Sequence, residues 1–224
     1  FVEKYEASPT PSDSAVMHAR KKTISDTVDL AIQQQGNINE RYNQKPISKV
    51  PEELVEYVDA ATDGKIDISR KYVAIHGSNI WHEYRNHSNP SIEIGRHQIA
   101  NTASDIKEAI EAIYHPDVVE ALFTKSSNVN QQQSFAYAKK TSNGHYVVVE
   151  AVGGKRNPNV VPVMILQFDE KKWNDMIANG MVLGQLLYEN DPEKLSELDV
   201  SAIKKNRVTV AQFASKKPLL NTPR

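Results

Sequence analysis

The spacing of apolar residues predicts three helices in the first half of the chain. In residues 51–62 and 102–116 apolar side chains recur at three- and four-residue steps, which places them along one face of a helix. Residues 79–87 predict a further, more polar helix. The helix at residues 79–87 ends before Pro90 and the helix at residues 102–116 ends at Pro116, because proline cannot continue a helix.

Runs of β-branched and other apolar residues predict strands later in the chain. Residues 134–141 and 145–152 flank an Asn-Gly pair that suits a tight turn, so we expect a β-hairpin there. Further strands are expected at residues 71–77, 118–125, 159–168 and 207–214, and further helices at residues 171–179 and 181–189. This order predicts an α+β fold: N-terminal helices packed on a mostly antiparallel β-sheet, with additional C-terminal helices.

Residues 1–50 differ from the rest of the chain in composition. They are rich in Ser, Pro, Gln and Asn, and show only a short amphipathic patch at residues 27–32. Segments of this kind rarely pack, so we expect a mobile polar linker or arm, followed by a single domain over residues 51–224. The chain shows neither a secretory signal nor a run of about eighteen apolar residues, so no membrane partner is expected.

Composition and charge narrow the candidate chemistry. The chain lacks cysteine, which excludes disulfides, thiol nucleophiles and cysteine-ligated zinc. Its formal net charge is −1, whereas nucleic-acid-binding proteins are commonly strongly basic, so any such binding must be local. Six of the seven histidines lie between residues 71 and 156. We therefore expect the chemistry between about His76 and Thr209.

The segment His-Glu-Tyr-Arg-Asn-His at residues 82–87 places two histidines, an arginine and a glutamate within six residues. Five helical residues turn the chain through about 500°, so His82 and His87 cannot chelate one ion from one face, and we expect neither a metal nor another cofactor. Glu83 shares a face with His87 and could orient its imidazole, while Arg85 lies one turn from His82. This set suits acid–base chemistry on an anionic substrate. The alternative is a solvated polar helix face with one packed histidine.

The expected hairpin brings a second group of polar side chains together. Strand alternation puts Lys139 and Thr141 on one face and Lys140 on the other, with His145 across the turn. One face could meet a phosphate, for which lysine serves as a point charge. The alternative is that the lysines protect a sheet edge against aggregation. Thr209 on the last expected strand is a weaker candidate.

Taken together, these segments resemble a known nuclease superfamily. A helix ending in His87, a second helix ending before Pro116, the strand SFAYAKKT, the Asn-Gly turn and the strand VVPVMILQF follow one another over roughly residues 50–214. This succession resembles the phage-type members of the barnase, EndoU, colicin and RelE (BECR) superfamily. Those members occur as C-terminal modules of MuF-like and polyvalent phage proteins.

The resemblance implies metal-independent endoribonuclease activity. A base would deprotonate the ribose 2′-OH, which attacks the adjacent phosphate, and an acid would protonate the leaving 5′ oxygen, giving a 2′,3′-cyclic phosphate. His87 matches the helix-end histidine, Lys139 or Lys140 the hairpin cation, and Thr209 the late hydroxyl.

In the same resemblance, other candidates surround the reacting phosphate. His82 and Arg85 would position the substrate, with His82 also a catalytic candidate. Thr141 would bind substrate, and His145 would bind substrate or act as a second acid or base.

The resemblance also implies partners and a place of action. RNA, with tRNA among the candidates, would be the substrate, and an immunity or antitoxin protein would inhibit the enzyme. It would act in the cytoplasm of a bacterial host, directly or after delivery as part of a phage or larger protein. Two alternatives stay open: a non-catalytic interaction or virion-associated module, which the near-neutral charge favours, and an NAD-using enzyme.

Overall fold

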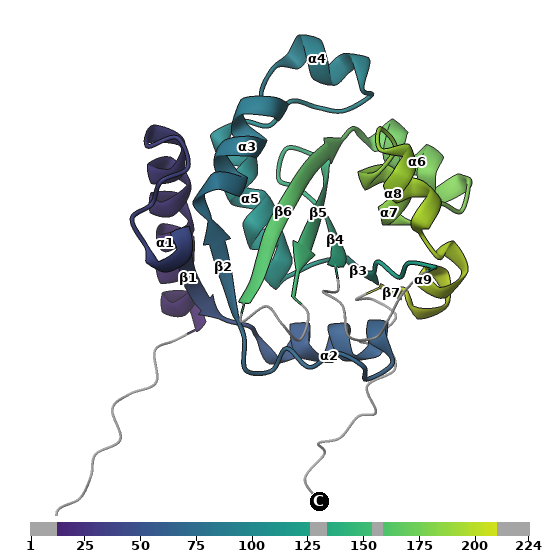
Figure 1. The fold of residues 1–224 in the computed structure, drawn as a ribbon, viewed down its shortest axis with the longest axis horizontal. Coiled ribbons are helices and arrows are strands. Elements are labelled where there is room, and N and C mark those ends of the chain that lie inside the picture. Colours follow the sequence, from purple (N-terminus) through teal and green to yellow (C-terminus); the bar gives the residue numbers. More distant parts are fainter. Residues whose placement is uncertain (1–12, 126–133, 154–158, 210–224) are drawn as a thin grey trace, which may run out of the picture.

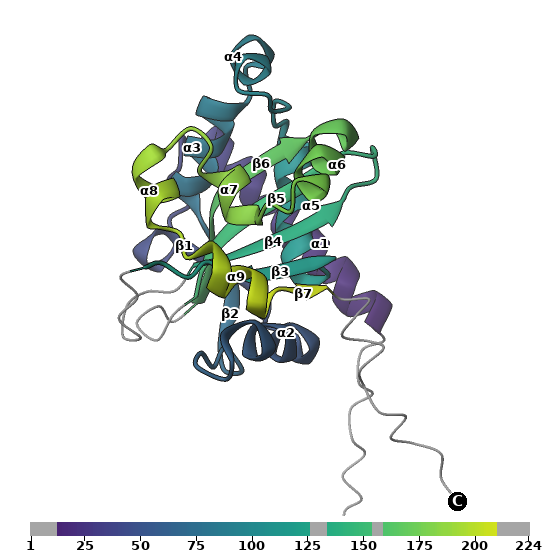
Figure 2. The same ribbon diagram turned by 90° about the vertical axis from the view of Figure 1, so that its right-hand side faces the viewer.

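The structure, a computed structural model, describes residues 13–125, 134–153 and 159–209. It contains a seven-stranded sheet in the order β1-β2-β6-β5-β4-β3-β7, with helices on both faces (Figures 1 and 2). All neighbouring strands are antiparallel except β2 and β6. The strands are β1 Gln44–Lys49, β2 Tyr72–His76, β3 Val118–Ala121, β4 Ser134–Lys140, β5 Tyr146–Val152, β6 Asn159–Phe168 and β7 Val208–Thr209. The predicted α+β class with a mostly antiparallel sheet is confirmed.

The helices cover the sheet in two groups. The first group comprises α1 Asp13–Gln33, α3 Gly77–His87 and α5 Ala103–Tyr114, with α2 Glu52–Thr62 across one end of the sheet and the short α4 Pro90–Gly95 projecting from the other (Figure 1). The second group, on the opposite face, comprises α6 Glu170–Ala178, α7 Leu183–Leu187, α8 Pro192–Glu197 and α9 Val200–Asn206 (Figure 2). A single 3-10 turn, η1 Arg41–Asn43, precedes β1. In the described ranges no helix combines the length and apolarity needed to cross a bilayer.

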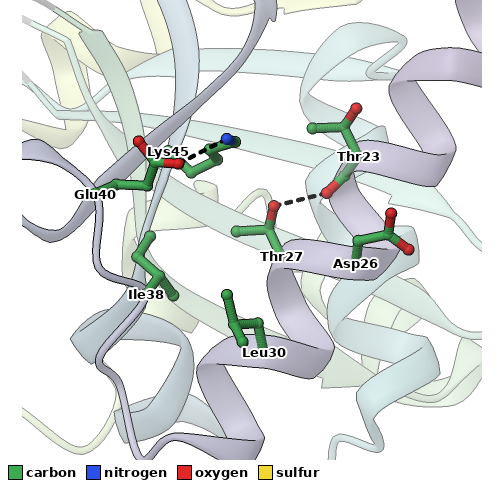
Figure 3. Close-up of a pocket in the computed structure, with 7 residues that line it drawn as sticks. All are labelled: Thr23, Asp26, Thr27, Leu30, Ile38, Glu40 and Lys45. Carbon is green, nitrogen blue, oxygen red and sulfur yellow. Dashed lines mark hydrogen bonds and ion pairs between the residues drawn. The ribbon is translucent and has the colours of Figure 1, made fainter.

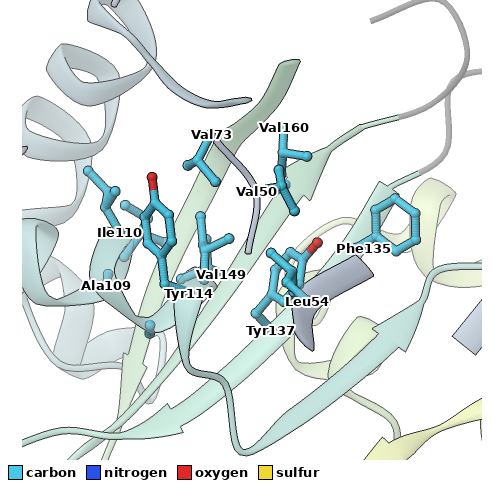
Figure 4. Close-up of a cluster of buried hydrophobic side chains, with 14 of the residues drawn as sticks. Val50, Leu54, Val73, Ala109, Ile110, Tyr114, Phe135, Tyr137, Val149 and Val160 are labelled. Atoms are coloured by element: carbon cyan, nitrogen blue, oxygen red, sulfur yellow. The ribbon is translucent and has the colours of Figure 1, made fainter. Parts of the chain in front are cut away.

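Both faces of the central strands are buried. Along β4, Phe135 and Tyr137 belong to the core that also holds Leu54 of α2 and Ile110 of α5 (Figure 4), whereas Ala136 and Ala138 belong to the core on the side of α7. Strands buried on two sides need apolar residues at nearly every position, which explains the continuous apolar runs of β5 and β6. Two hydrophobic cores therefore lie on either side of one sheet.

The predicted hairpin of β4 and β5 is confirmed, but its turn is longer than an Asn-Gly pair. The Thr141 amide donates to the His145 carbonyl at 2.8 Å, and the Asn143 side chain accepts from the His145 amide at 3.1 Å. Gly144 has a φ of +86°, which glycine adopts without strain, whereas Asn143 is not among the described residues with positive φ. The turn is thus closed by side-chain as well as backbone bonds.

Residues 13–49 do not form the expected arm. They form α1 and β1, and the α1 side chains Ile24 and Val28 are fully buried in the core. The Arg20 guanidinium binds the Glu111 carboxylate of α5 at 2.9 Å. The expectation was wrong because the composition of this segment is polar on average, although a few apolar residues recur at helical spacing and form one apolar face of α1. The first twelve residues of the expected arm lie outside the described residues.

Two buried glutamates fix α7 to the sheet. Glu120 of β3 accepts a hydrogen bond from the Leu183 amide at 2.7 Å, at the start of the helix. At its other end, the Tyr188 hydroxyl donates to Glu150 of β5, also at 2.7 Å. Because buried carboxylates need such partners, these bonds hold α7 in one position over β4 and β5. That position places Leu187 at the wall of the groove described next.

Candidate functional site

A groove of about 560 Å³ opens between the end of α3, the α4 segment, strand β6 and the connection from α7 to α8. Its apolar side chains are Ile92, Met164, Leu166 and Leu187. The polar side chains that line it are His82, Arg85, Asn86, His87, Arg96, Gln98, Asn190 and Asp191. Three of the sequence-predicted site residues, His82, Arg85 and His87, therefore share one concave surface.

His87 is held by a buried carboxylate. Its Nδ1 lies 3.1 Å from Oε2 of Glu93, whose side chain is only 1% exposed. The other oxygen, Oε1, accepts from the Arg96 guanidinium at 2.8 Å. A carboxylate at this ring nitrogen assigns the proton to Nδ1 and leaves Nε2 as the atom that can meet a substrate. Glu83, the predicted orienting partner, forms no hydrogen bond or ion pair with His87 within the described residues, and Glu93 takes that role instead.

Local sequence explains why Glu93 reaches His87. Asn89 caps α4 by accepting from the Ser91 amide, and Pro90 occupies the first turn, so the chain reverses directly after α3. The His87 carbonyl also accepts from the Asn101 amide at 2.7 Å. The end of α3 and the α4 segment are thereby fixed together. The sequence contained a signal for this contact: Pro90 begins a helix shortly after His87, and Glu93 lies in the first turn of that helix.

His82 and Arg85 are connected through one amide. Asn86 Nδ2 lies 3.1 Å from both ring nitrogens of His82, and its Oδ1 accepts from Arg85 Nε at 3.2 Å. Desolvation lowers the pKa of His82, and the nearby His87 and Arg85 lower it further. The ring is therefore neutral near pH 7 and able to accept a proton.

His82 and His87 point to different sides of α3 and so cannot chelate one ion from one helix face. They still line the same groove, because the groove extends around the end of α3. Within the described ranges, no three His, Cys, Asp or Glu side chains gather closely enough to hold a metal ion.

Glu83 lies inside the protein, between α3 and β6. It is 2% exposed, and its Oε2 has no hydrogen-bond partner among the residues that the structure describes. Burial raises the pKa of this carboxyl from 4.5 to about 8, although a hydrogen bond from the Ile165 backbone opposes the shift. The carboxylates of Glu93 and Glu150 add to the increase in its pKa. Glu83 is therefore a protonated structural residue at neutral pH.

This pKa predicts how stability depends on pH. Between pH 4.5 and about 8 the folded state keeps a proton on Glu83 that the unfolded state has lost. The contribution of Glu83 to the free energy of unfolding therefore falls as the pH rises through this window. Glu83→Gln removes the ionisation, so its stability relative to the native sequence should rise by about 1 to 4 kcal/mol from pH 5 to pH 8. Urea unfolding of both proteins at each pH measures this, and a difference that is constant with pH would contradict it.

The predicted hairpin lysines do not line the groove. Lys139 Nζ donates to the His115 carbonyl at 2.6 Å and lies 3.6 Å from Asp117, whereas Lys140 pairs with Glu170 at 2.9 Å. Their partners lie on opposite faces of the sheet, as strand alternation predicted. Strand β5 separates β4 from β6, so the hairpin strand runs about 10 Å from the strand that lines the groove.

The remaining predicted residues also lie outside the groove. Thr141 Oγ1 donates to the His145 carbonyl at 2.9 Å, which makes both residues part of the hairpin turn. Thr209 lies on β7 at the edge of the sheet, four strand positions and about 19 Å from β6. The structure therefore does not bring Thr141, His145 or Thr209 to the histidines. The order of the strands along the chain suggested that Thr209 would lie near the histidines. The order of the strands in the sheet places it at the far edge instead.

A separate hollow of about 330 Å³ lies between α1 and the segment that leads into β1 (Figure 3). Its polar groups are already paired within the chain. Lys45 binds Glu40 at 2.7 Å, and the Thr27 hydroxyl donates to the Thr23 carbonyl at 2.7 Å. This hollow contains none of the predicted site residues, and the groove at His87 is the stronger candidate.

Residues missed by the sequence reasoning complete the groove. Arg96, Asn190 and Asp191 line it together with the α3 histidines. About one hundred residues separate the last two from α3, so no local spacing could have indicated them.

Comparisons with known proteins add no further assignment. No protein-family model matches the chain, and neither a curated protein nor a solved structure matches it. The resemblance to the BECR nucleases stays a prediction that rests on the order of the elements and on His87. The groove that unites His82, Arg85, His87 and Arg96 is therefore the basis for a functional proposal.

Proposed function

We propose that this protein is a metal-independent endoribonuclease whose active site is the groove at the end of α3. The observation that carries the proposal is the grouping of His82, His87, Arg85 and Arg96 around one concave surface, with His87 fixed by the buried Glu93. Cleavage by 2′-OH transphosphorylation needs a base, an acid and positive charge at the phosphate. The two histidines would supply the base and the acid, and the two arginines would supply the positive charge.

The two histidines have different surroundings, which suggests their roles. The lowered pKa of His82 makes it the base that accepts the proton of the 2′-OH. The 2′ oxygen then attacks phosphorus, and the bond to the 5′ oxygen breaks. His87 begins the reaction protonated on both ring nitrogens: Nδ1–H faces the Glu93 carboxylate, and Nε2–H donates its proton to the leaving 5′ oxygen. Arg85 and Arg96 would stabilise the charge of the pentacoordinate phosphate.

In this proposal the substrate is RNA, including tRNA, and the place of action is the cytoplasm of a bacterial host. The protein would reach it directly or as part of a phage or larger protein, and an immunity or antitoxin protein would restrain it. The hairpin residues and Thr209 take no part in the reacting centre, because none of them lines the groove.

One observation favours a non-catalytic interaction module instead. Lys139 and Lys140, which would attract RNA, are both neutralised by carboxylates of the chain itself. Phosphate neutralisation provides most of the affinity of nucleic-acid binders, so weak RNA binding would favour this alternative.

Incubation with RNA in the presence of EDTA tests the reaction class. We expect total RNA and tRNA to be cut into fragments with 2′,3′-cyclic phosphate ends, at a rate unchanged by EDTA. The control is a DNA strand of the same sequence, which should stay intact because it lacks the attacking 2′-OH. RNA that stays intact at high protein concentration would instead support the interaction module.

A further inference from the structure

Tyr42 is the most exposed of the large hydrophobic side chains in the described ranges. It lies in the 3-10 turn before β1, and 77% of its surface is open to solvent, compared with 47% for Tyr72 on β2. Burial of apolar area stabilises the folded state, and aromatic rings usually bury much of their surface. A ring that the fold leaves almost free is available to a ligand.

Hydrogen bonds fix the loop that carries this ring. The Asn43 side chain accepts from the Ile38 amide at 3.0 Å and donates to the Gly36 carbonyl at 2.7 Å. Tyr42 itself has a φ of +58°, a left-handed conformation that costs free energy for a residue with a Cβ. The backbone at the ring is therefore held in place before a ligand binds, which lowers the entropic cost of binding.

A cation accompanies the ring. The Arg41 guanidinium lies over one face of Tyr42, 5.0 Å from the ring centroid, and the high exposure of the side chain leaves the opposite face to a ligand. Arg41 forms no ion pair with a carboxylate of the described residues, whereas the adjacent Glu40 is already paired with Lys45 at 2.7 Å. An open aromatic face beside an unpaired guanidinium suits a nucleotide, because its base can stack and its phosphate is an anion.

The loop adjoins the helix that leads to the groove. Asn43 Nδ2 lies 3.5 Å from Ser78 Oγ in the first turn of α3. Ser78, His82 and Arg85 follow one another at four- and three-residue steps, so they lie on one face of α3, and all three are exposed. Four helical residues advance by about 6 Å, and both His82 and Arg85 line the groove. An exposed polar stripe therefore connects the loop to the candidate active site.

We propose that Tyr42 is a stacking platform for a base of single-stranded RNA that lies outside the groove, with Arg41 at a neighbouring phosphate. The RNA would follow the exposed face of α3, so the protein would bind several unpaired nucleotides and not only the two that flank the cleaved bond. Bases inside a duplex stack on one another and cannot reach the ring. The inference rests on the proposed function, because it defines the substrate class of the same site.

Tyr42→Ala tests the stacking, and Tyr42→Phe is its matched control because phenylalanine keeps the ring. The probes are single-stranded RNAs of two and eight nucleotides with 2′-O-methyl groups in place of every 2′-OH, so they bind without being cut. In fluorescence anisotropy, Tyr42→Ala should bind the eight-nucleotide probe about 5- to 100-fold more weakly, the effect of losing one stacked base. Tyr42→Phe should keep the native affinity. The two-nucleotide probe should bind all three proteins alike, because it is too short to extend from the groove to the ring.

A salt titration tests the cation. Arg41→Gln should weaken binding of the eight-nucleotide probe and reduce the slope of log affinity against log salt by about 0.7, the value for one phosphate contact of a single strand. A native slope in Arg41→Gln would overturn the assignment of Arg41 to a phosphate. Tyr72→Ala removes the other exposed tyrosine, which lies at the end of β2 remote from α3, and should keep the native affinity.

The outcomes distinguish this inference from the proposed function. If RNA is cut but Tyr42→Ala binds the eight-nucleotide probe as the native sequence does, the inference is overturned and the nuclease proposal stands. An equal loss for the two-nucleotide probe, or for Tyr72→Ala, would also overturn it, since the effect would then not come from a base at Tyr42. If RNA is never cut but the longer probe binds with an affinity that depends on Tyr42, the nuclease proposal fails and the RNA-binding surface stands. A native protein that binds neither probe overturns the inference.

Discussion

We expect His87→Ala to lower the rate of RNA cleavage by about 10² to 10⁴-fold, the range that a positioned acid or base contributes. Glu93 binds Nδ1 of the imidazole ring, and Nε2 is the ring atom available to a substrate. The side chain takes no part in either hydrophobic core, so the fold should persist. RNA affinity should change much less than the cleavage rate, because Arg85 and Arg96 remain.

Single-turnover cleavage with enzyme in excess measures this effect without interference from product release. His18→Ala is the matched control, because His18 lies on the exposed side of α1 and away from the groove. Equal rates for His87→Ala and the native sequence would remove His87 from the mechanism. A smaller loss in Glu93→Gln than in His87→Ala would support a positioning role for Glu93, and the pH profile of its rate should shift because the charge beside the imidazole is removed.

We expect Ile24→Ala to lower the free energy of unfolding by about 2 to 5 kcal/mol, because it leaves a cavity in a packed core. Ile24 is fully buried, on the face of α1 that packs against α3 and α5. A mobile arm would show no such loss. The measurement therefore decides whether α1 is an integral part of the domain.

Urea unfolding of Ile24→Ala beside Val16→Ala gives the comparison. Val16 lies on the same helix but is 47% exposed, so its replacement should change the free energy of unfolding by less than about 0.5 kcal/mol. Similar effects for both variants would mean that α1 does not pack in solution as described.

The sequence by itself determined the local structure. Helices α2, α3 and α5 and the hairpin of β4 and β5 follow from periodicity and turn chemistry, because these signals depend on residues a few positions apart. The grouping of His82, Arg85 and His87 was predictable for the same reason, since one short helix carries all three. The α+β class followed from the order of the elements.

Only the tertiary structure decided which contacts these elements make with distant parts of the chain. It packed α1 onto the domain, since a few buried side chains outweigh the polar average of residues 1–50. It replaced Glu83 with Glu93 as the partner of His87, because the chain reverses at Pro90. It also left Thr209 four strands from the groove, since strand order in the sheet differs from strand order in the chain. Such contacts depend on how distant segments share one core, and local spacing does not encode that arrangement.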